Sequence, residues 1–304
     1  MSDLGGAVFA LGGAVSRRLP PSVRYGSARV GGVIGYRLVG RLRRQALENY
    51  AAILNQPESS PEVQRVAREA VVGYTKLLAD FVLLPTLSRE RVVEMVDWEG
   101  IEHIHRAREL GRGVIVVTPH FGNWDIAAAA TTAVGLPLTA VTERYGTSDL
   151  NRRVVEARER IGMRVVPLGI TAGKAVITAL RRNELVALVC DLPPREGRAV
   201  MVRICGQQAI VPAGPALLAL RTGAPVLPFV CRRLPDDRYR IEVQAPVQLS
   251  PTGAGTQDVE AMAQAIMDRF DPILRATPEQ WYLFSPMWHR AESSAAEAKL
   301  AVAP

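Results

Sequence analysis

Cysteines, histidines and aromatic side chains are scarce in this sequence, and each shortage narrows what the protein can be. The three cysteines form no Cys-x-x-Cys pair, and no pair of histidines lies near them to complete a zinc site. We therefore predict no metal site and three buried, reduced thiols at Cys190, Cys205 and Cys231. Aromatic residues make up 6% of the chain. No basic patch is interleaved with them, as a protein that binds single-stranded nucleic acid requires. The sequence therefore argues against nucleic acid as a partner.

Long apolar runs are missing as well. No uninterrupted apolar stretch approaches the roughly 20 residues that a helix needs to span a bilayer. The apolar stretch 5–15 is followed by Arg17 and Arg18, whereas a secretory signal carries its positive charge before the apolar stretch. The sequence therefore predicts a protein that is not integral to a membrane.

Positive charge, in contrast, is plentiful. Lys and Arg number 37 against 30 Asp and Glu, for a formal net charge of +7, which suggests an anionic partner. Many arginines lie near the start of the chain, at positions 17, 18, 24, 29, 37, 41, 43 and 44. Read as helices, 5–15 and 23–44 each present an apolar stripe flanked by arginines, which suits an anionic membrane surface. We assign residues 1–50 to an N-terminal amphipathic helical membrane-associating segment; the alternative is an ordinary amphipathic helix packed on the core.

Residues 51–290 read as a single α/β domain. A helix begins at Ser60-Pro61 and continues on its apolar spacing to Phe81. Beyond it, short β-branched runs alternate with helical patterns, at 113–118, 136–142, 164–168, 185–190, 200–205 and 225–231. This alternation predicts a mixed, mostly parallel central sheet flanked by helices. Residues 238–244 have the pattern of an antiparallel edge strand, and 291–304 that of a disordered tail.

The candidate chemistry lies where the first strong strand ends. His120 leaves this strand, and Asp125 follows five positions later at the start of an Ala-rich helical run. A carboxylate there can fold back onto one imidazole nitrogen and free the other to act as a general base. The alternative is that Asp125 caps the helix and His120 is an ordinary loop histidine. No Gly-x-Ser-x-Gly elbow is present to supply a serine nucleophile.

The segment His120-Phe-Gly-Asn-Trp-Asp125 resembles the His-x-x-x-x-Asp signature of glycerolipid-type acyltransferases, in the form used by the bacterial lipid A lauroyl/myristoyl acyltransferase family. The resemblance extends over most of the chain, from the region of Arg43 to Arg290. Several blocks are similar to the phosphatidylinositol mannoside acyltransferases: 141–144, 149–150, Arg158, 161–168, 211–215, 222–228, 278–282 and Trp288.

The resemblance implies an O-acyltransferase bound peripherally at the cytoplasmic face of the bacterial plasma membrane. Its co-substrate would be acyl-CoA or an acyl carrier protein, and its acceptor a hydroxyl of a membrane glycolipid, of the phosphatidylinositol mannoside or the lipid A type. No cofactor is implied.

The resemblance also assigns roles to residues of this chain. It makes His120 and Asp125 catalytic and gives Arg158 a substrate role, although by its pattern alone Arg158 could be one more solvated helix charge. Glu143 and Arg144 leave a strand at the same expected edge of the sheet as His120. Asn123 lies in the segment whose backbone N–H groups, or else an arginine, could face the developing oxyanion. We count these residues as substrate-binding candidates.

One departure from the family pattern concerns a second catalytic acid. The phosphatidylinositol mannoside acyltransferases carry a glutamate on a strand that follows an Asp-Leu segment. When the two sequences are aligned on Gly206, the position of that glutamate is occupied by Met201. Glu196 is the nearest carboxylate and is the candidate for this catalytic acid; the alternative, which its pattern favours, is a solvated turn residue. The missing acid leaves a second function open, that of a catalytically silent, lipid-binding member of the same fold.

Overall fold

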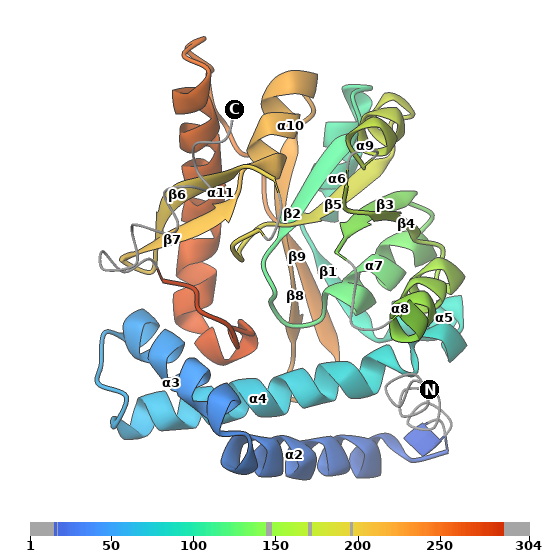
Figure 1. Ribbon diagram of the computed structural model, residues 1–304. Coiled ribbons are helices and arrows are strands. Elements are labelled where there is room, and N and C mark those ends of the chain that lie inside the picture. Colours follow the sequence, from blue (N-terminus) through green and yellow to red (C-terminus); the bar gives the residue numbers. More distant parts are fainter. Residues whose placement is uncertain (1–14, 17, 144–147, 170–171, 195–196, 289–304) are drawn as a thin grey trace.

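A seven-stranded sheet forms the centre of the molecule in the computed structural model, which describes residues 15–16, 18–143, 148–169, 172–194 and 197–288 (Figure 1). The strand order is β1-β9-β8-β2-β5-β3-β4. The strands are β1 (Val96–Glu99), β2 (Val114–Thr118), β3 (Leu138–Thr142), β4 (Arg164–Pro167), β5 (Leu185–Val189), β8 (Val226–Arg233) and β9 (Tyr239–Val243). Strands β2, β3, β4, β5 and β8 are parallel, and β1 and β9 run in the opposite direction. The predicted α/β class with a mostly parallel sheet is confirmed.

Helices cover both faces of this sheet. One face packs against α9 (Ala172–Arg181), α10 (Gly214–Thr222) and α11 (Thr256–Ala276), and the other against α5 (Arg89–Glu94), α6 (Ile101–Glu109), α7 (Trp124–Ala133) and α8 (Ser148–Arg160). Every residue of β2 is buried, with Ile115 and Val117 facing one layer and Val114 and Val116 the other. This explains why β2 reads as a continuous apolar run instead of an alternating one.

Three longer helices lie across one edge of the sheet: α2 (Pro21–Leu38), α3 (Gly40–Leu54) and α4 (Pro61–Phe81). Figure 1 shows α4 crossing beneath the carboxyl ends of the parallel strands, with α2 on its outer side. The predicted helix 60–81 is therefore confirmed as α4. Two short 3₁₀ turns, η1 (Leu84–Thr86) and η2 (Pro278–Gln280), complete this edge.

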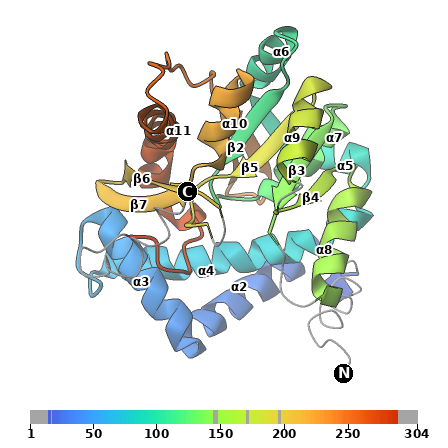
Figure 2. The same cartoon turned by 45° about the horizontal axis from the view of Figure 1, so that its top comes forward.

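Two strand predictions need correction. The run 200–205 does not join the central sheet, because β6 (Ala199–Ile204) pairs with β7 (Gln207–Pro212) in a separate hairpin beside α11 (Figure 2). Cys205 and Gly206 form its turn with φ of 53° and 78°, the two positive values of a type I′ turn. Strand β9 is antiparallel to β8 as predicted, but β1 lies outside it and occupies the edge.

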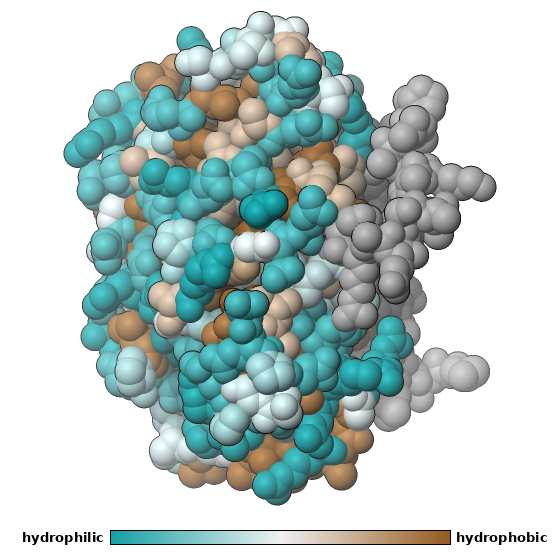
Figure 3. Space-filling model, turned by 90° about the vertical axis from the view of Figure 1, so that its left-hand side faces the viewer, coloured by the Kyte–Doolittle hydropathy of each residue, from teal (hydrophilic) through white to brown (hydrophobic). Residues whose placement is uncertain are grey.

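The predicted helix 23–44 is divided at Val39 into α2 and α3. Helix α3 buries Tyr50 completely in the core, whereas α2 leaves one apolar row uncovered. The side chains of that row are 48 to 78% exposed: Val23, Val30, Ile34 and Leu38. Brown, apolar atoms gather along the lower margin of Figure 3, the level at which α2 lies in Figure 1.

Among the described residues, no helix combines the length and the apolar character needed to cross a bilayer. Most of the predicted apolar stretch 5–15, Arg17, and the predicted tail 291–304 lie outside the described residues.

Candidate active site

Two neighbouring parallel strands bring His120 and Asp191 together. Strand β5 pairs with β2 in a register that sets Thr118 opposite Val189. Each strand then continues for two more residues into a loop at the same edge of the sheet. His120 on one side and Asp191 on the other therefore meet at the carboxyl ends of the strands, where open α/β sheets carry their active sites.

Asp191 holds His120 by two hydrogen bonds. Its Oδ1 lies 2.8 Å from His120 Nδ1, and its Oδ2 accepts from the His120 backbone N–H at 2.9 Å. The indole N–H of Trp281 donates to the same Oδ2 at 2.7 Å. Asp191 is fully buried, while the His120 side chain is 31% exposed. With Nδ1–H directed at the carboxylate, the neutral ring presents Nε2 as an acceptor.

The predicted contact between Asp125 and His120 is wrong. Both oxygens of Asp125 accept instead from Arg158, from Nε at 2.7 Å and from Nη2 at 3.2 Å. Helix α7 begins at Trp124, so Asp125 lies in its first turn and is buried against α8. The two residues that the sequence singled out separately are thus one bidentate ion pair beside the histidine.

Asn123 has an internal role in place of the predicted one in substrate binding. Its side chain is 1% exposed, and its Oδ1 caps α7 by accepting from the backbone N–H of Ile126. Its Nδ2 donates to Asp80 and to the Tyr239 hydroxyl. The amide therefore fixes the start of α7 and is not turned toward the imidazole.

The backbone N–H groups around Asn123 are also engaged. Those of Phe121, Gly122 and Asn123 donate to the carbonyls of Pro119, Gln280 and Cys231 at 2.7, 2.8 and 2.9 Å. Gly122 has φ of +60°, and a Cβ there would lie 1.8 Å from the Cys231 carbonyl oxygen, so this position accepts only glycine. Of the two sources of oxyanion donors considered from the sequence, these observations favour an arginine.

The charges around His120 oppose the effect of burial. Burial lowers the pKa of His120, but the adjacent Asp191 carboxylate and the nearby Glu143 charge more than offset this, and Arg158 opposes them. The net pKa of His120 lies above its ordinary value of 6.5. Burial in turn raises the pKa of Asp191, and its bonds from His120 and Trp281 reverse this, so that the carboxyl stays ionised.

Sequence reasoning overlooked the roles of Asp191 and Trp281. Asp191 carries a local signal, because an acid follows directly after the apolar run 185–190. Asp191 is far from His120 in the chain, however, and nothing in the sequence indicates that the strands before these two residues, β2 and β5, are neighbours. Trp281 lies in a block that resembled the family, but nothing in the spacing connects its indole to Asp191.

Aromatic rings extend from the histidine toward α4. Trp124 meets the His120 ring edge to face at 5.2 Å between centroids, and Tyr282 lies 6.3 Å from Trp124. The centroid of the Tyr74 ring of α4 lies 5.6 Å from that of Tyr282 and 5.4 Å from that of Phe284. This aromatic surface is chemically suited to an apolar chain next to His120.

The other predicted site residues are placed as follows. Glu143 follows β3 at the same edge and is exposed, while Arg144 and Glu196 lie outside the described residues. Met201 is 40% exposed on the β6–β7 hairpin. The three thiols are free and buried as predicted, and burial raises the pKa of Cys205 to about 12. Within the described part of the chain, no three His, Cys, Asp or Glu side chains are grouped to hold a metal ion.

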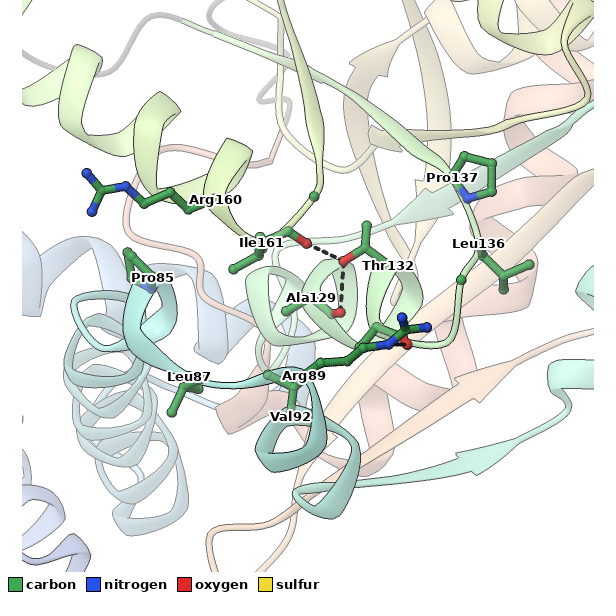
Figure 4. A pocket seen from close by; sticks show the side chains of 13 residues that line it. Pro85, Leu87, Arg89, Val92, Ala129, Thr132, Leu136, Pro137, Arg160 and Ile161 are labelled. Carbon is green, nitrogen blue, oxygen red and sulfur yellow. Dashed lines mark hydrogen bonds between the residues drawn. The ribbon is translucent and has the colours of Figure 1, made fainter.

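A cavity of about 420 Å³ lies away from His120, between α5 and the C-terminal ends of α7 and α8 (Figure 4). Arg89 Nε donates to the Ala133 carbonyl, and Thr132 Oγ1 donates to the carbonyls of Ala129 and Ile161. These polar groups complete helix ends, so we give the cavity no part in the chemistry.

Comparison with known proteins agrees with the motif blocks. The family described as bacterial lipid A biosynthesis acyltransferase matches residues 7–290. The phosphatidylinositol mannoside acyltransferase of Mycolicibacterium smegmatis is 30% identical, over 99% of this chain and 95% of its own. The enzyme of that name from Mycobacterium tuberculosis is 29% identical, over 84% and 80%. The lipid A biosynthesis lauroyltransferase of Escherichia coli is 25% identical, over 66% and 62%. The resemblance stated from the sequence is confirmed.

Proposed function

Because the chain belongs to the bacterial lipid A biosynthesis acyltransferase family, we propose that it transfers a fatty acyl group from a thioester to a hydroxyl of a glycolipid. The observation that carries this proposal is the His120–Asp191 pair at the carboxyl edge of the sheet. A buried carboxylate orients an imidazole that is itself partly exposed, which is the arrangement of a general base.

In the proposed mechanism, His120 Nε2 takes the proton of the acceptor hydroxyl as its oxygen attacks the thioester carbonyl. The C–O bond forms and the carbonyl oxygen becomes an oxyanion. When the tetrahedral intermediate collapses, the C–S bond breaks and the thiol leaves with the proton from the imidazolium. Asp191 stabilises the imidazolium between these two steps. His120 ends neutral, so the cycle needs neither a covalent enzyme intermediate nor a cofactor.

We propose that Arg158 stabilises negative charge on the substrates or on the reacting atoms. Its guanidinium is held by Asp125 in a bidentate pair and lies over the Phe81 ring at 5.5 Å. Its charge reaches His120, as the lowering effect on the pKa of that residue indicates. A fixed guanidinium near the base can stabilise the oxyanion or a phosphate of either substrate.

Two substrates complete the proposal. We propose acyl-CoA or an acyl carrier protein as the donor, since both present an acyl thioester on an acidic carrier and the chain is basic, with a net charge of +7. For the acceptor we propose a phosphatidylinositol mannoside type before a lipid A type. Support comes from the 30% identity over nearly the whole of the mycobacterial enzyme, against 25% over about two thirds of the lipid A enzyme.

We further propose that the protein binds peripherally to the cytoplasmic face of the plasma membrane through α2. Its uncovered apolar row, Val23, Val30, Ile34 and Leu38, supports this proposal. Exposed arginines are close to the row in the chain, at positions 29 and 37 on α2 and at 41, 43 and 44 on α3. An apolar row among arginines suits the headgroup region of an anionic leaflet.

Mass spectrometry of reaction products tests the proposed function. Purified protein receives a mixed acyl-CoA pool or the matching acyl carrier protein thioesters, each with a phosphatidylinositol mannoside or a lipid A precursor in vesicles. We expect an acceptor whose mass increases by one acyl group, with release of free thiol. Unmodified acceptor in every combination would contradict the proposal.

The silent, lipid-binding alternative has one observation in its favour, the absence of an acid at Met201. That side chain belongs to the separate β6–β7 hairpin, while the His120–Asp191 pair is complete without it. Slow thioester hydrolysis by the wild-type protein, lost when His120 is replaced, would exclude the silent alternative even before the acceptor is known.

A further inference from the structure

Asp80 is a buried carboxylate that joins several elements beneath the active site. It lies in the last turn of α4 and is 3% exposed. Tyr25 of α2 donates to its Oδ1 at 2.7 Å. Its Oδ2 accepts from Tyr239 of β9, Arg233 of β8 and Asn123 at the start of α7. One charged group therefore connects α2, the sheet and the loop that carries His120.

The bond to Asn123 fixes the far end of that loop. Asn123 Nδ2 donates to Asp80 Oδ2 at 3.2 Å and to the Tyr239 hydroxyl at 3.0 Å. Asn123 is three residues beyond His120, and the next residue, Trp124, packs edge to face on the imidazole. Asp191 thus holds the loop at His120, and Asp80 holds it at the Asn123 side chain, next to the Cys231 carbonyl that accepts from the Asn123 backbone N–H. A shift of either anchor changes where the imidazole points.

The bond to Tyr25 leads outward to the helix with the uncovered apolar row. Burial and the Asp80 charge raise the pKa of Tyr25, so its hydroxyl keeps its proton and donates. The Arg233 guanidinium lies over the Tyr25 ring at 5.2 Å. Tyr25 is two positions from Val23, the first side chain of the row. Any displacement of α2 at this point reaches Asp80 through one hydrogen bond.

We propose that Tyr25, Asp80 and Asn123 form a positioning link through which contact of α2 with an anionic lipid surface orders the loop that carries His120. The link rests on the acyl-transfer function and the membrane contact proposed above. It makes the lipid surface a requirement for the active geometry as well as the place where the acceptor is found. None of the three residues touches the reacting atoms.

Two tyrosines of α2 provide a matched pair of variants. Tyr25 and Tyr36 are both buried, and each hydroxyl bonds to a residue of α4, Asp80 for Tyr25 and Gln64 for Tyr36. Gln64 lies near the opposite end of α4 from Asp80. Tyr25→Phe therefore cuts the link, whereas Tyr36→Phe removes a similar hydroxyl from the same interface and leaves the link intact.

Hydrogen–deuterium exchange of residues 119–126 measures the ordering directly. The probe is a vesicle of phosphatidylcholine with phosphatidylglycerol. We expect the vesicles to slow exchange in the wild-type protein and in Tyr36→Phe. In Tyr25→Phe we expect about tenfold less slowing, the size of effect that loss of one hydrogen bond to a charged group corresponds to. Vesicle flotation should be equal for the three proteins.

Kinetics provide the second measurement. With the acceptor in vesicles, Tyr25→Phe should lose about tenfold in kcat with KM unchanged, and Tyr36→Phe should match the wild type. With the acceptor in detergent, all three proteins should have the same low kcat. Asn123→Ser keeps the oxygen that caps α7 but removes the donor to Asp80, so it should repeat the effect of Tyr25→Phe from the other end.

Several outcomes overturn the link. It fails if Tyr25→Phe keeps the wild-type response to vesicles in exchange, if Tyr36→Phe loses that response to the same degree, or if wild-type exchange does not respond to vesicles. Failure of acyl transfer by the wild-type protein overturns the proposed function instead, and the exchange measurement still decides the link. If Tyr25→Phe does not fold, Asn123→Ser decides it in the same way.

Discussion

The loop between β2 and α7 lies between two buried carboxylates whose partners differ in one chemical property. Asp191 holds His120 and Asp125 holds Arg158, each through two hydrogen bonds. An imidazole can lose and regain a proton near neutral pH, whereas a guanidinium stays charged. Two similar ion pairs, side by side at one sheet edge, are therefore suited to different work: one to move a proton and the other to present a fixed positive charge.

The largest effect should come from the group that moves the proton. His120→Ala removes the general base, and we expect kcat to fall by about 10²- to 10⁴-fold with the fold intact. Product formation by mass spectrometry, with circular dichroism for the fold, checks this. His105→Ala is the control, because His105 is an exposed histidine on α6. Wild-type activity in His120→Ala would contradict the assignment of the base.

Substitution of Asp191 and substitution of Asp125 should have different kinetic effects. Asp191→Asn should lower kcat by about 10²- to 10³-fold, because the amide no longer stabilises the imidazolium or fixes its tautomer. Asp125→Asn should lower kcat/KM by a smaller factor, since it loosens Arg158 and not His120. Steady-state kinetics with acyl-CoA as the varied substrate distinguishes the two. An Asp125→Asn variant with the larger loss of kcat would restore the pairing first predicted from the sequence.

A smaller change is expected when the fixed charge is kept but its shape is altered. Arg158→Lys retains the positive charge and loses the bidentate contact with Asp125, so kcat/KM should fall by about tenfold. Arg153→Lys is the matched control, because Arg153 pairs with Asp149 on the same helix in a more exposed position. Equal values of kcat/KM for the two variants would argue against the role proposed for Arg158.

The smallest effect concerns pH. The general base must be neutral, and the pKa of His120 is raised above 6.5, so activity should fall on the acid side as pH drops through that raised value. Glu143→Gln removes a negative charge that favours the imidazolium. The pKa should then fall, and the acid limb of kcat/KM should move to lower pH by less than about one unit. Glu159→Gln is the control, because Glu159 is an exposed glutamate of α8, and it should leave the acid limb of kcat/KM unchanged. A shift of this limb to higher pH in Glu143→Gln would contradict the effect assigned to the Glu143 charge.

Much of the fold can be predicted from local sequence patterns. The apolar runs that became β2, β5 and β8 and the spacing that became α4 depend on neighbours within a few residues of the chain. Strand β1 is short and has one edge free, so Val96–Glu99 carries too little pattern to be recognised. The break between α2 and α3 at Val39 was not predicted either, because no proline or cluster of turn residues marks it.

The candidate site was only partly predictable. His120 stands out because it is one of four histidines and leaves a strong strand next to a family motif. Its partner was misassigned to Asp125 because the two are close in sequence, although the direction in which Asp125 points depends on where α7 begins. Asp191 becomes the partner because β5 lies between β2 and β3. Strand order of this kind leaves no mark in the spacing of residues.

By itself, the sequence determined the α/β class and the family, and it singled out the histidine and the arginine to which we assign the chemistry. The tertiary structure decided which carboxylate pairs with which of them, and it joined Tyr25 of α2 to the loop that carries His120 through Asp80. The reason is physical. Periodicity, capping and turn residues act over a few positions of the chain, whereas the pairing of strands and the burial of a charge depend on how the whole core is packed.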